Sequence, residues 1–406
     1  MRQADASRLE VALVKGRDQL LALFEGFERA LGSDGLHIAY DPVLNLPLWE
    51  LGHIGWFEEF WLARNAARGR GAACDPQGPR SASVLPGADA LYDSSNVPHT
   101  QRWQLALPDA AATRRYLGAV RARTLELLRH CGSSDDELYF FRLVLFHEDM
   151  HREAWQFMAQ QLGVSLDTSM VQRGPQMSDV QGQWLVPAAE LQLGSTGPGF
   201  AFDNELAAER QHVPSFTIDR APVSWARYLP FVQAGGYVES RWWSPDGWRW
   251  REQQAAAHPR HLRHLRHPRH AGGSWQQHRF GHWLPLDEAA PAVHLTAFEA
   301  QAWCRWAQRR LPTEIEWELA ATCAPLQGEA FEWGQVWEWT ASPFAAYPGF
   351  VPHPYRDYSQ PWFDGRPVLR GASFATAAHM KHPRFRNFFS ADRNDVFAGF
   401  RSCALA

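Results

Sequence analysis

The residues of this chain whose type and spacing best suit chemistry are two histidines four residues apart. They are His147 and His151, in the run His-Glu-Asp-Met-His. If this run is helical, both imidazoles project from one face of the helix and can bind one metal ion. The run fits the His-Glu-x-x-His pattern of zinc proteases, so a metalloprotease stays open. The alternative is a pair of core-facing histidines with hydrogen-bonded rings.

A third histidine, His53, lies far upstream in a second stretch that is expected to be helical, residues 49–61. Two helices of a bundle can bring three neutral imidazoles together and leave the other positions of a metal ion open. Open positions are what a metal needs in order to bind substrate and oxygen. His53, His147 and His151 are therefore the candidate metal ligands.

The elements that must hold these histidines are predicted from the spacing of apolar residues. Four helices are expected in the first 165 residues, and a long connection from Gly69 to Pro108 separates the second from the third. This order is typical of a four-helix bundle, whose facing helices commonly carry metal sites. The expected helices are Ser7–Leu31, Leu46–Arg68, Ala110–His130 and Asp135–Leu162.

The character of the sequence changes after the fourth helix. Residues 165–183 are polar and lack helical periodicity, which predicts a division of the chain into domains 1–168 and 169–406. Short β-like runs alternate with Gly- and Pro-rich loops beyond it. The runs include 184–187 and 215–218, and two helices are expected at 224–234 and 296–310. The predicted class is α+β, with an N-terminal bundle and a mixed second domain.

The bulk composition excludes several classes of protein. The 406 residues include 45% hydrophobic residues and carry a net charge of −4, which suits sizeable cores and argues against a nucleic-acid binder. The chain begins without an apolar signal core, and no stretch approaches the roughly 18 apolar residues of a membrane span. Five scattered cysteines without a Cys-x-x-Cys pair favour a reducing cytoplasm. The expected partners are small molecules, with no nucleic acid and no membrane.

One segment has a biased composition. His and Arg recur almost every third residue from His258 to His270. A His-rich tract can bind metal, but the prolines, the spacing and the arginine charge oppose a tight chelate. The tract is expected to be an exposed, insertion-like loop.

The second half carries six short motifs: Leu193–Ser195, Phe202–Glu205, Arg310–Glu318, Val336–Thr340, Arg370–Phe374 and Ala398–Arg401. Their order resembles the domain of formylglycine-generating enzymes, a C-type-lectin-like mixed fold. The first half resembles DinB-like bundles. Together the two halves resemble the ergothioneine-biosynthesis sulfoxide synthases and the related selenoneine synthases over nearly the whole chain.

This resemblance implies a specific chemistry. In that family the bundle histidines bind a non-haem ferrous iron, which implies Fe²⁺ on His53, His147 and His151. The family joins a thiol or selenol compound to C2 of the imidazole of hercynine, a trimethylated histidine, using dioxygen. Holding the partners on one metal converts an improbable encounter into an ordered one.

The resemblance also implies roles for residues outside the metal-binding motif. Tyr347 lies in the segment where sulfoxide synthases place a proton-supplying tyrosine, with a packed tyrosine as the alternative. Asn387 is the candidate contact for the hercynine carboxylate. Phe388 and Phe389 are expected to wall the trimethylammonium group by cation–π attraction, worth about 0.5–2 kcal/mol. Arg102 lies where the family places arginines for the second substrate, with a surface arginine as the alternative.

Departures from the family pattern concern the second substrate. Met150 stands where a glutamine often precedes the last ligand histidine, and Phe389 where an acidic residue is expected. Arg102 has no second arginine beside it. A zwitterionic donor needs paired charges in a partly buried pocket. The expected donor is therefore a selenosugar, as in selenoneine synthases, and the alternative is cysteine or γ-glutamylcysteine, as in ergothioneine sulfoxide synthases.

Two other functions compete with this prediction. A formylglycine-generating oxidase would need a close cysteine pair in the second domain, and Cys304, Cys323 and Cys403 form none in the sequence. A non-catalytic binding module with a lectin-like domain is the other alternative, which metal content and oxygen consumption would distinguish.

Overall fold

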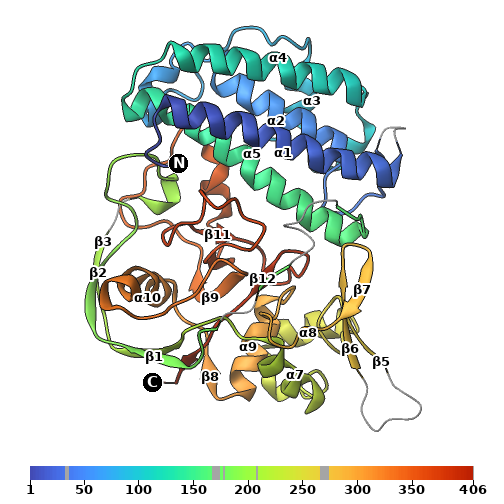
Figure 1. The fold of residues 1–406 in the computed structure, drawn as a ribbon, viewed down its shortest axis with the longest axis vertical. Coiled ribbons are helices and arrows are strands. Elements are labelled where there is room, and N and C mark those ends of the chain that lie inside the picture. The colour runs from blue at the N-terminus through green and yellow to red at the C-terminus, as the bar shows by residue number, and fades with distance from the viewer. Residues whose placement is uncertain (33–35, 167–173, 177–178, 207–208, 266–273, 406) are drawn as a thin grey trace.

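The structure is a computed structural model that describes residues 1–32, 36–166, 174–176, 179–206, 209–265 and 274–405. It has the predicted α+β class, with a helical bundle at one end and a mixed domain at the other (Figure 1). The bundle helices are α1 (Ala6–Leu31), α2 (Pro47–Trp61), α4 (Ala110–Arg129) and α5 (Asp135–Leu162). The connection from α2 to α4 contains η1 (Arg68–Ala73), α3 (Ala88–Tyr92) and η2 (His99–Gln104).

Local sequence sets the ends of the bundle helices. Ser134 and Glu137 exchange side-chain and backbone hydrogen bonds in a capping box that begins α5. Gly163 ends this helix with a φ of 68°, a left-handed conformation that glycine adopts without strain. The second helix is shorter than the predicted 46–68. It ends at Trp61, where the Asn65 side chain donates to the Trp61 carbonyl in place of the helical hydrogen-bond pattern.

Two four-stranded sheets form the centre of the mixed domain, in the orders β1-β4-β13-β8 and β11-β10-β9-β12. The first consists of Gln183–Val186, Phe216–Asp219, Cys403–Ala404 and Arg309–Arg310, in that order. The second consists of Asn387–Phe388, Pro367–Arg370, Trp337–Pro343 and Ala398–Gly399. In Figure 1 the second sheet lies on the bundle side of the first.

Smaller elements surround these sheets. They are the ribbon β2 (Ala189–Leu193) and β3 (Glu209–Val213), and the sheet β5 (Leu262–Leu265), β6 (Ser274–Arg279) and β7 (His282–Pro285). The helices are α7 (Trp225–Gln233), α8 (Pro245–Gln253), α9 (Ala297–Trp306) and α10 (Glu314–Gln327). The 3₁₀ turns η3 (Asp203–Glu205), η4 (Ser240–Trp242), η5 (Arg356–Tyr358) and η6 (Gln360–Trp362) lie between them.

Most of the predicted elements of the second domain are present. The strands expected at 184–187 and 215–218 are β1 and β4, and the helices expected at 224–234 and 296–310 are α7 and α9. The loop predicted at 258–270 is wrong for Leu262–Leu265, which pair with β6 as a strand. Residues 266–270 of that tract lie outside the described residues, as does the boundary predicted at 168/169.

One hydrophobic core runs through both domains, and α5 is the helix they share. On the domain side of α5, the Phe157 ring lies 4.8 Å from the Phe397 ring. The buried Glu153 carboxylate accepts hydrogen bonds from Trp337 Nε1 at 2.7 Å, Thr376 Oγ1 at 2.7 Å and Ser373 Oγ at 2.5 Å. The helix that carries two of the predicted ligands is therefore fixed by the second domain as well as by the bundle.

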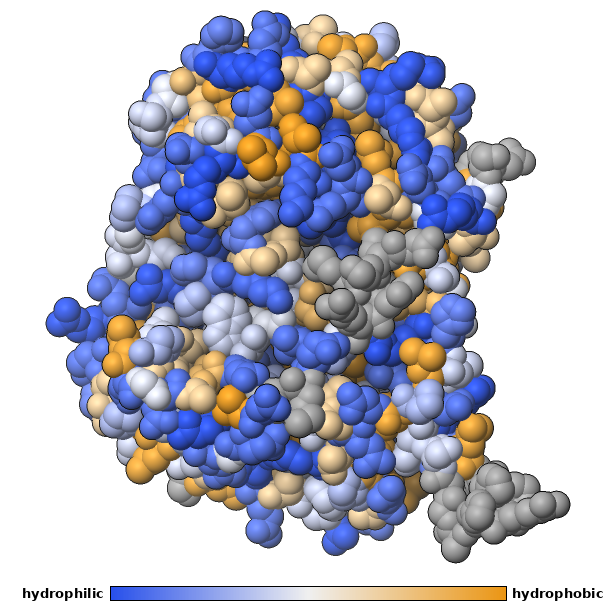
Figure 2. Space-filling model, in the orientation of Figure 1, coloured by the Kyte–Doolittle hydropathy of each residue, from blue (hydrophilic) through white to orange (hydrophobic). Residues whose placement is uncertain are grey.

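Within the described part of the chain, no helix is long and apolar enough to cross a membrane. On the face shown in Figure 2, outside the grey residues, hydrophobic side chains form small separate patches among polar ones. Scattered apolar side chains of this kind are usual on globular proteins.

Candidate metal centre

The three candidate ligand histidines meet between α2 and α5. One ring nitrogen from each of His53, His147 and His151 lies within 4.8 Å of the other two, the only such group of three that the described residues contain. The Nε2 atoms of His147 and His151 are 3.2 Å apart. Two nitrogens that bind one metal at right angles, each at about 2.1 Å, would be about 3.0 Å apart. The spacing therefore fits a shared metal ion.

Hydrogen bonds to the second ring nitrogen orient two of the ligands. The Nδ1 of His53 lies 2.8 Å from the Tyr92 carbonyl oxygen, and the Nδ1 of His151 lies 2.5 Å from Glu50 Oε1. Because both partners are acceptors, Nδ1 carries the proton and Nε2 presents its lone pair. Metal-binding histidines commonly have such partners, which fix the tautomer and the ring orientation.

Close packing around His53 depends on a glycine. The Trp49 ring stacks on the His53 ring at 5.0 Å between centroids, with an angle of 8° between the planes. A Cβ at Gly52 would lie 2.2 Å from the Tyr92 ring. Any other residue at position 52 would thus displace Tyr92, whose carbonyl orients His53.

Burial keeps two of the candidate ligand imidazoles, those of His53 and His147, neutral. Burial and the nearby His151 lower the pKa of His53 to about 3. Burial also lowers the pKa of His147 well below its ordinary value, with further lowering from His151 and His53. Neutral imidazole is the form that binds a metal, so these two residues are in the ligand form at neutral pH.

Glu148 follows His147 directly but lies on another side of α5, in contact with two arginines. Arg17 Nε is 3.0 Å and Arg121 Nη2 is 2.5 Å from its carboxylate oxygens. The same two arginines bind Glu58 of α2, both at 2.8 Å. All four side chains are buried. Glu148 is therefore not placed as the general base that a metalloprotease would need.

Arg102 lies one aromatic ring away from the ligands. Its guanidinium carbon is 3.8 Å from the centroid of the Trp49 ring, which stacks on His53. It donates from Nη1 to Asn45 Oδ1 at 2.6 Å and from Nη2 to the Val97 carbonyl at 3.4 Å. Neither partner is charged, and burial lowers the pKa of Arg102. Among the described residues no carboxylate lies within hydrogen-bonding distance of this cation.

The tyrosine beside the histidines is Tyr355, not Tyr347. The Tyr355 ring lies 6.1 Å from the His147 ring and 4.8 Å from the Phe57 ring, which stacks on His147 at 3.6 Å. Tyr347 belongs to a second, smaller core among α10, β1 and β2, where its hydroxyl donates to Glu314 at 3.2 Å. The chain after β9 thus buries Tyr347 within the second domain before it returns to the bundle at Tyr355.

The candidate hercynine contacts lie on β11 and directly after it. Asn387 Oδ1 accepts from the Phe388 amide at 2.8 Å, so this side chain is turned to its own backbone. The Phe388 ring stacks on Phe344 at 4.0 Å, whereas the Phe389 ring lies 6.4 Å from Phe157 of α5. Successive residues of an extended chain point to opposite sides. The structure therefore gives the two rings different neighbours and shows no shared wall.

Met150 is partly buried against the main core. It precedes His151 on α5, so it is rotated by about 100° from that ligand around the helix. Its side chain therefore leaves the helix beside the ligand face.

Three residues of the site were missing from the sequence prediction: Glu50, Tyr92 and Tyr355. Glu50 has a signal, since it lies three residues before His53 and so shares its helix face. Tyr92 and Tyr355 reach the site from distant connections, and no pattern in the sequence indicates them.

Two known families match successive parts of the chain. The DinB superfamily matches residues 12–154, which include the three histidines. The sulfatase-modifying factor enzyme 1-like domain matches residues 168–335 and 332–405. The two matches follow the division between bundle and mixed domain.

Two of the similar proteins match nearly the whole chain, across both the bundle and the mixed domain. The chain is 33% identical to the hercynine oxygenase of Mycolicibacterium smegmatis over 97% of each chain. It is 33% identical to the hercynine oxygenase of Mycobacterium tuberculosis over 89% of this chain and 91% of that one. The formylglycine-generating enzyme of Streptomyces coelicolor is 31% identical, but over 38% of this chain and 51% of its own.

Proposed function

This chain belongs to the hercynine oxygenase family, and we propose that it joins the sulfur of a thiol donor to C2 of the hercynine imidazole, with ferrous iron and dioxygen. The observation that carries the proposal is the three-histidine centre between α2 and α5, in a chain similar to hercynine oxygenases along 97% of its length. The donor set supports iron, because neutral imidazoles suit it and leave positions open for substrates.

The proposed reaction balances with dioxygen as the only oxidant. The S–H bond of the donor and the C2–H bond of hercynine break, and a carbon–sulfur bond forms. One oxygen atom ends on the sulfur as a sulfoxide. The other takes both hydrogens and leaves as water.

A ferrous ion held by the three imidazoles would supply the one-electron chemistry that lets dioxygen react with closed-shell organic molecules. Glu50 and Tyr92 fix the tautomers of His151 and His53 whose Nε2 atoms would bind such an ion. Burial raises the pKa of Tyr355, so its phenol keeps its proton at neutral pH. This phenol is the proposed proton donor to groups bound beside His147.

The proposed donor is cysteine or γ-glutamylcysteine, in preference to the selenosugar expected from the sequence. The names of the relatives support hercynine as one substrate, and none of them concerns selenium. Arg102 supports a donor with a carboxylate. Glu50 acts on Arg102 only through its charge, without a hydrogen bond. A partly buried cation without a hydrogen-bonded carboxylate is costly, and a donor carboxylate would supply that contact, whereas a neutral sugar would not.

Donor turnover tests the proposal. Protein loaded with Fe²⁺ under anaerobic conditions is mixed with hercynine, air and one donor, and products are identified by mass. We expect a sulfoxide conjugate with cysteine or γ-glutamylcysteine and none from the His147→Ala variant. A higher kcat/KM with the selenosugar would overturn the choice of donor. Conversion of a cysteine peptide to formylglycine, or absence of all turnover, would overturn the proposed reaction.

Arg102→Met provides a sharper test of the donor site. Loss of a charge-assisted contact should raise the KM for an amino-acid thiol about tenfold. The KM for hercynine should stay within about twofold, because Arg102 is proposed to contact only the donor. Equal changes in both KM values would instead indicate a general disturbance around Trp49.

A further inference from the structure

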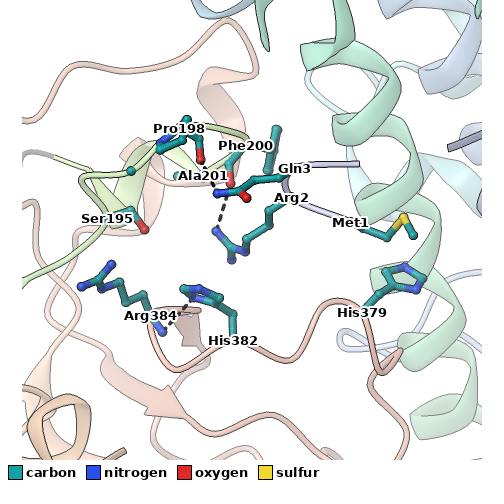
Figure 3. Close-up of a pocket in the computed structure, with 11 residues that line it drawn as sticks. Met1, Arg2, Gln3, Ser195, Pro198, Phe200, Ala201, His379, His382 and Arg384 are labelled. Atoms are coloured by element: carbon teal, nitrogen blue, oxygen red, sulfur yellow. Dashed lines mark hydrogen bonds between the residues drawn. The ribbon is translucent and has the colours of Figure 1, made fainter. Parts of the chain in front are cut away.

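A cavity of about 350 Å³ lies where the start of the chain meets two loops of the mixed domain (Figure 3). Its walls come from residues 1–3, 195–201 and 379–384. Gly199, with a φ of 95°, permits this meeting, because a Cβ there would lie 2.6 Å from the Arg2 carbonyl oxygen. The Phe200 amide donates to the same oxygen at 2.8 Å. A cavity of this size can hold a small metabolite.

The cavity lies on the side of α5 that faces away from the metal ligands. His379 on its wall bonds through Nε2 to Asp149 Oδ2 at 2.5 Å. Asp149 is two residues from both His147 and His151, which is about 200° around the helix. The cavity is therefore distinct from the metal centre.

The walls carry the positive charges of Arg2 and Arg384. They also include His379 and His382 and contain no acidic side chain. Together with two arginines outside the walls, these wall arginines outnumber the carboxylates that they contact. The arginines are Arg2, Arg370, Arg384 and Arg386, and the carboxylates are Glu205, Glu314 and Glu318. The nearby Asp203 bonds Ser359 and the His353 amide, and no ion pair joins it to these four arginines.

Arg384 is the arginine with the weakest pairing. Its Nε lies 3.5 Å from Glu318 Oε1, too far for a strong hydrogen bond. Glu318 is already engaged by Arg370 and by the Gly194 amide, which donates at 3.0 Å. Arg2, by contrast, is held by both oxygens of Glu205.

Neutral donors lie beside this guanidinium. Figure 3 shows Ser195, Arg2, His382 and Arg384 around one space. The Arg384 amide donates to His382 Nδ1 at 3.2 Å, so the proton of the neutral ring is on Nε2. Burial and the charges of Arg2 and Arg384 lower the pKa of His382 to about 3, which keeps the ring neutral. A hydroxyl and an imidazole N–H thus accompany the cations.

From this arrangement we infer a second ligand site, in which Arg384, Arg2, His382 and Ser195 bind a small metabolite through a carboxylate or phosphate group. Charged donors beside neutral ones are the usual composition of sites for such oxyanions. The site goes beyond the proposed reaction, because it shares no residue with the metal centre or with the proposed substrate contacts.

Calorimetric titration of the full-length protein tests this inference. Inorganic phosphate and succinate are the two probes, each titrated at constant ionic strength maintained with sodium chloride. We expect saturable binding of at least one probe and a higher melting temperature in its presence. If only phosphate binds, the site recognises a phosphate group, and if only succinate binds, it recognises a carboxylate. Absence of saturable binding for both overturns the inference.

Variants locate the bound anion. Arg384→Met should weaken binding about tenfold or more, and Glu318 keeps Arg370 as its partner in this variant. Arg249→Met is the matched control, since Arg249 is an exposed arginine of α8 whose loss should leave affinity unchanged. If Arg384→Met does not fold, Ser195→Ala should still weaken binding severalfold. Unchanged affinity in both Arg384→Met and Ser195→Ala would overturn the site.

Discussion

Glu50 determines which nitrogen of His151 is available to the metal. Its Oε1 is 2.5 Å from Nδ1 of that ring, and the carboxylate is buried. We expect Glu50→Gln to lower the affinity for Fe²⁺ about 10–100-fold, because a neutral amide polarises the imidazole less than a carboxylate does. Competition with a coloured chelator measures this affinity.

Glu59→Gln is the matched control for that substitution. Glu59 is also a buried carboxylate of α2, but it accepts from Ser83, Tyr116 and the Val84 amide. Its loss should leave metal affinity unchanged. Equal losses in the two variants would show that helix packing, and not the contact with His151, determines the affinity.

The roles of Tyr355 and Tyr347 can be distinguished by removing the phenol oxygen of each in turn. Tyr355→Phe keeps the ring next to Phe57 and removes the proposed proton donor, so kcat should fall about 10²-fold or more while bound iron stays constant. Tyr347→Phe loses a hydrogen bond to Glu314, which costs about 1 kcal/mol of stability, and should leave kcat within about twofold. The reverse pattern would return the catalytic role to Tyr347.

At the scale of elements, one ion-pair cluster links all the bundle helices. Arg17 of α1, Glu58 of α2, Arg121 of α4 and Glu148 of α5 form it. Because removal of one partner leaves a buried charge uncompensated, Glu58→Gln should lower the free energy of unfolding by about 3 kcal/mol or more. Urea unfolding of the metal-free protein measures the change, and Glu126→Gln, in an exposed pair, should cost less than about 0.5 kcal/mol.

The same cluster predicts a pH dependence. Burial alone would raise the pKa of Glu58, but Arg121 and Arg17 lower it to about 2, from an ordinary 4.5. A lowered pKa in the folded state means that this stabilisation is complete above pH 4.5 and is lost as the pH falls toward 2. The unfolding free energy of the wild type should therefore decline across this window more steeply than that of Glu58→Gln. Parallel declines would show that other groups control acid unfolding.

The bundle could be predicted from sequence because its signals are local. Apolar spacing and a capping box at Ser134 identify α5, and the four-residue spacing of His147 and His151 fixes their common face. The predicted end of α2 was too late in the sequence. The helix ends earlier because the Asn65 side chain donates to the Trp61 carbonyl, and this contact depends on local side-chain geometry. The strand Leu262–Leu265 was missed because its polar residues lack the apolar pattern of a strand, although it pairs with β6.

At the scale of the whole molecule, the meeting of the three histidines could be predicted and their surroundings could not. Two helices bring the histidines together, and helical periodicity is visible in sequence. Tyr92 and Tyr355 arrive on connections whose paths depend on packing across the entire fold. The location of Tyr347 away from the histidines has this origin, since eight residues along one loop separate its buried core position from Tyr355 beside His147.

The shared core predicts that neither domain works alone. Residues 1–166 contain all three ligand histidines, but α5 would lose Phe397 as a partner of Phe157 and would expose the buried Glu153 without its three donors. Exposed apolar surface of this kind promotes aggregation, and Tyr355 would be missing from the site. We expect this fragment to bind the dye ANS, to elute as oligomers in size exclusion, and to turn over no hercynine. A monomeric fragment that converts hercynine and a thiol would show that the mixed domain is dispensable, and the active site would then lie within the bundle.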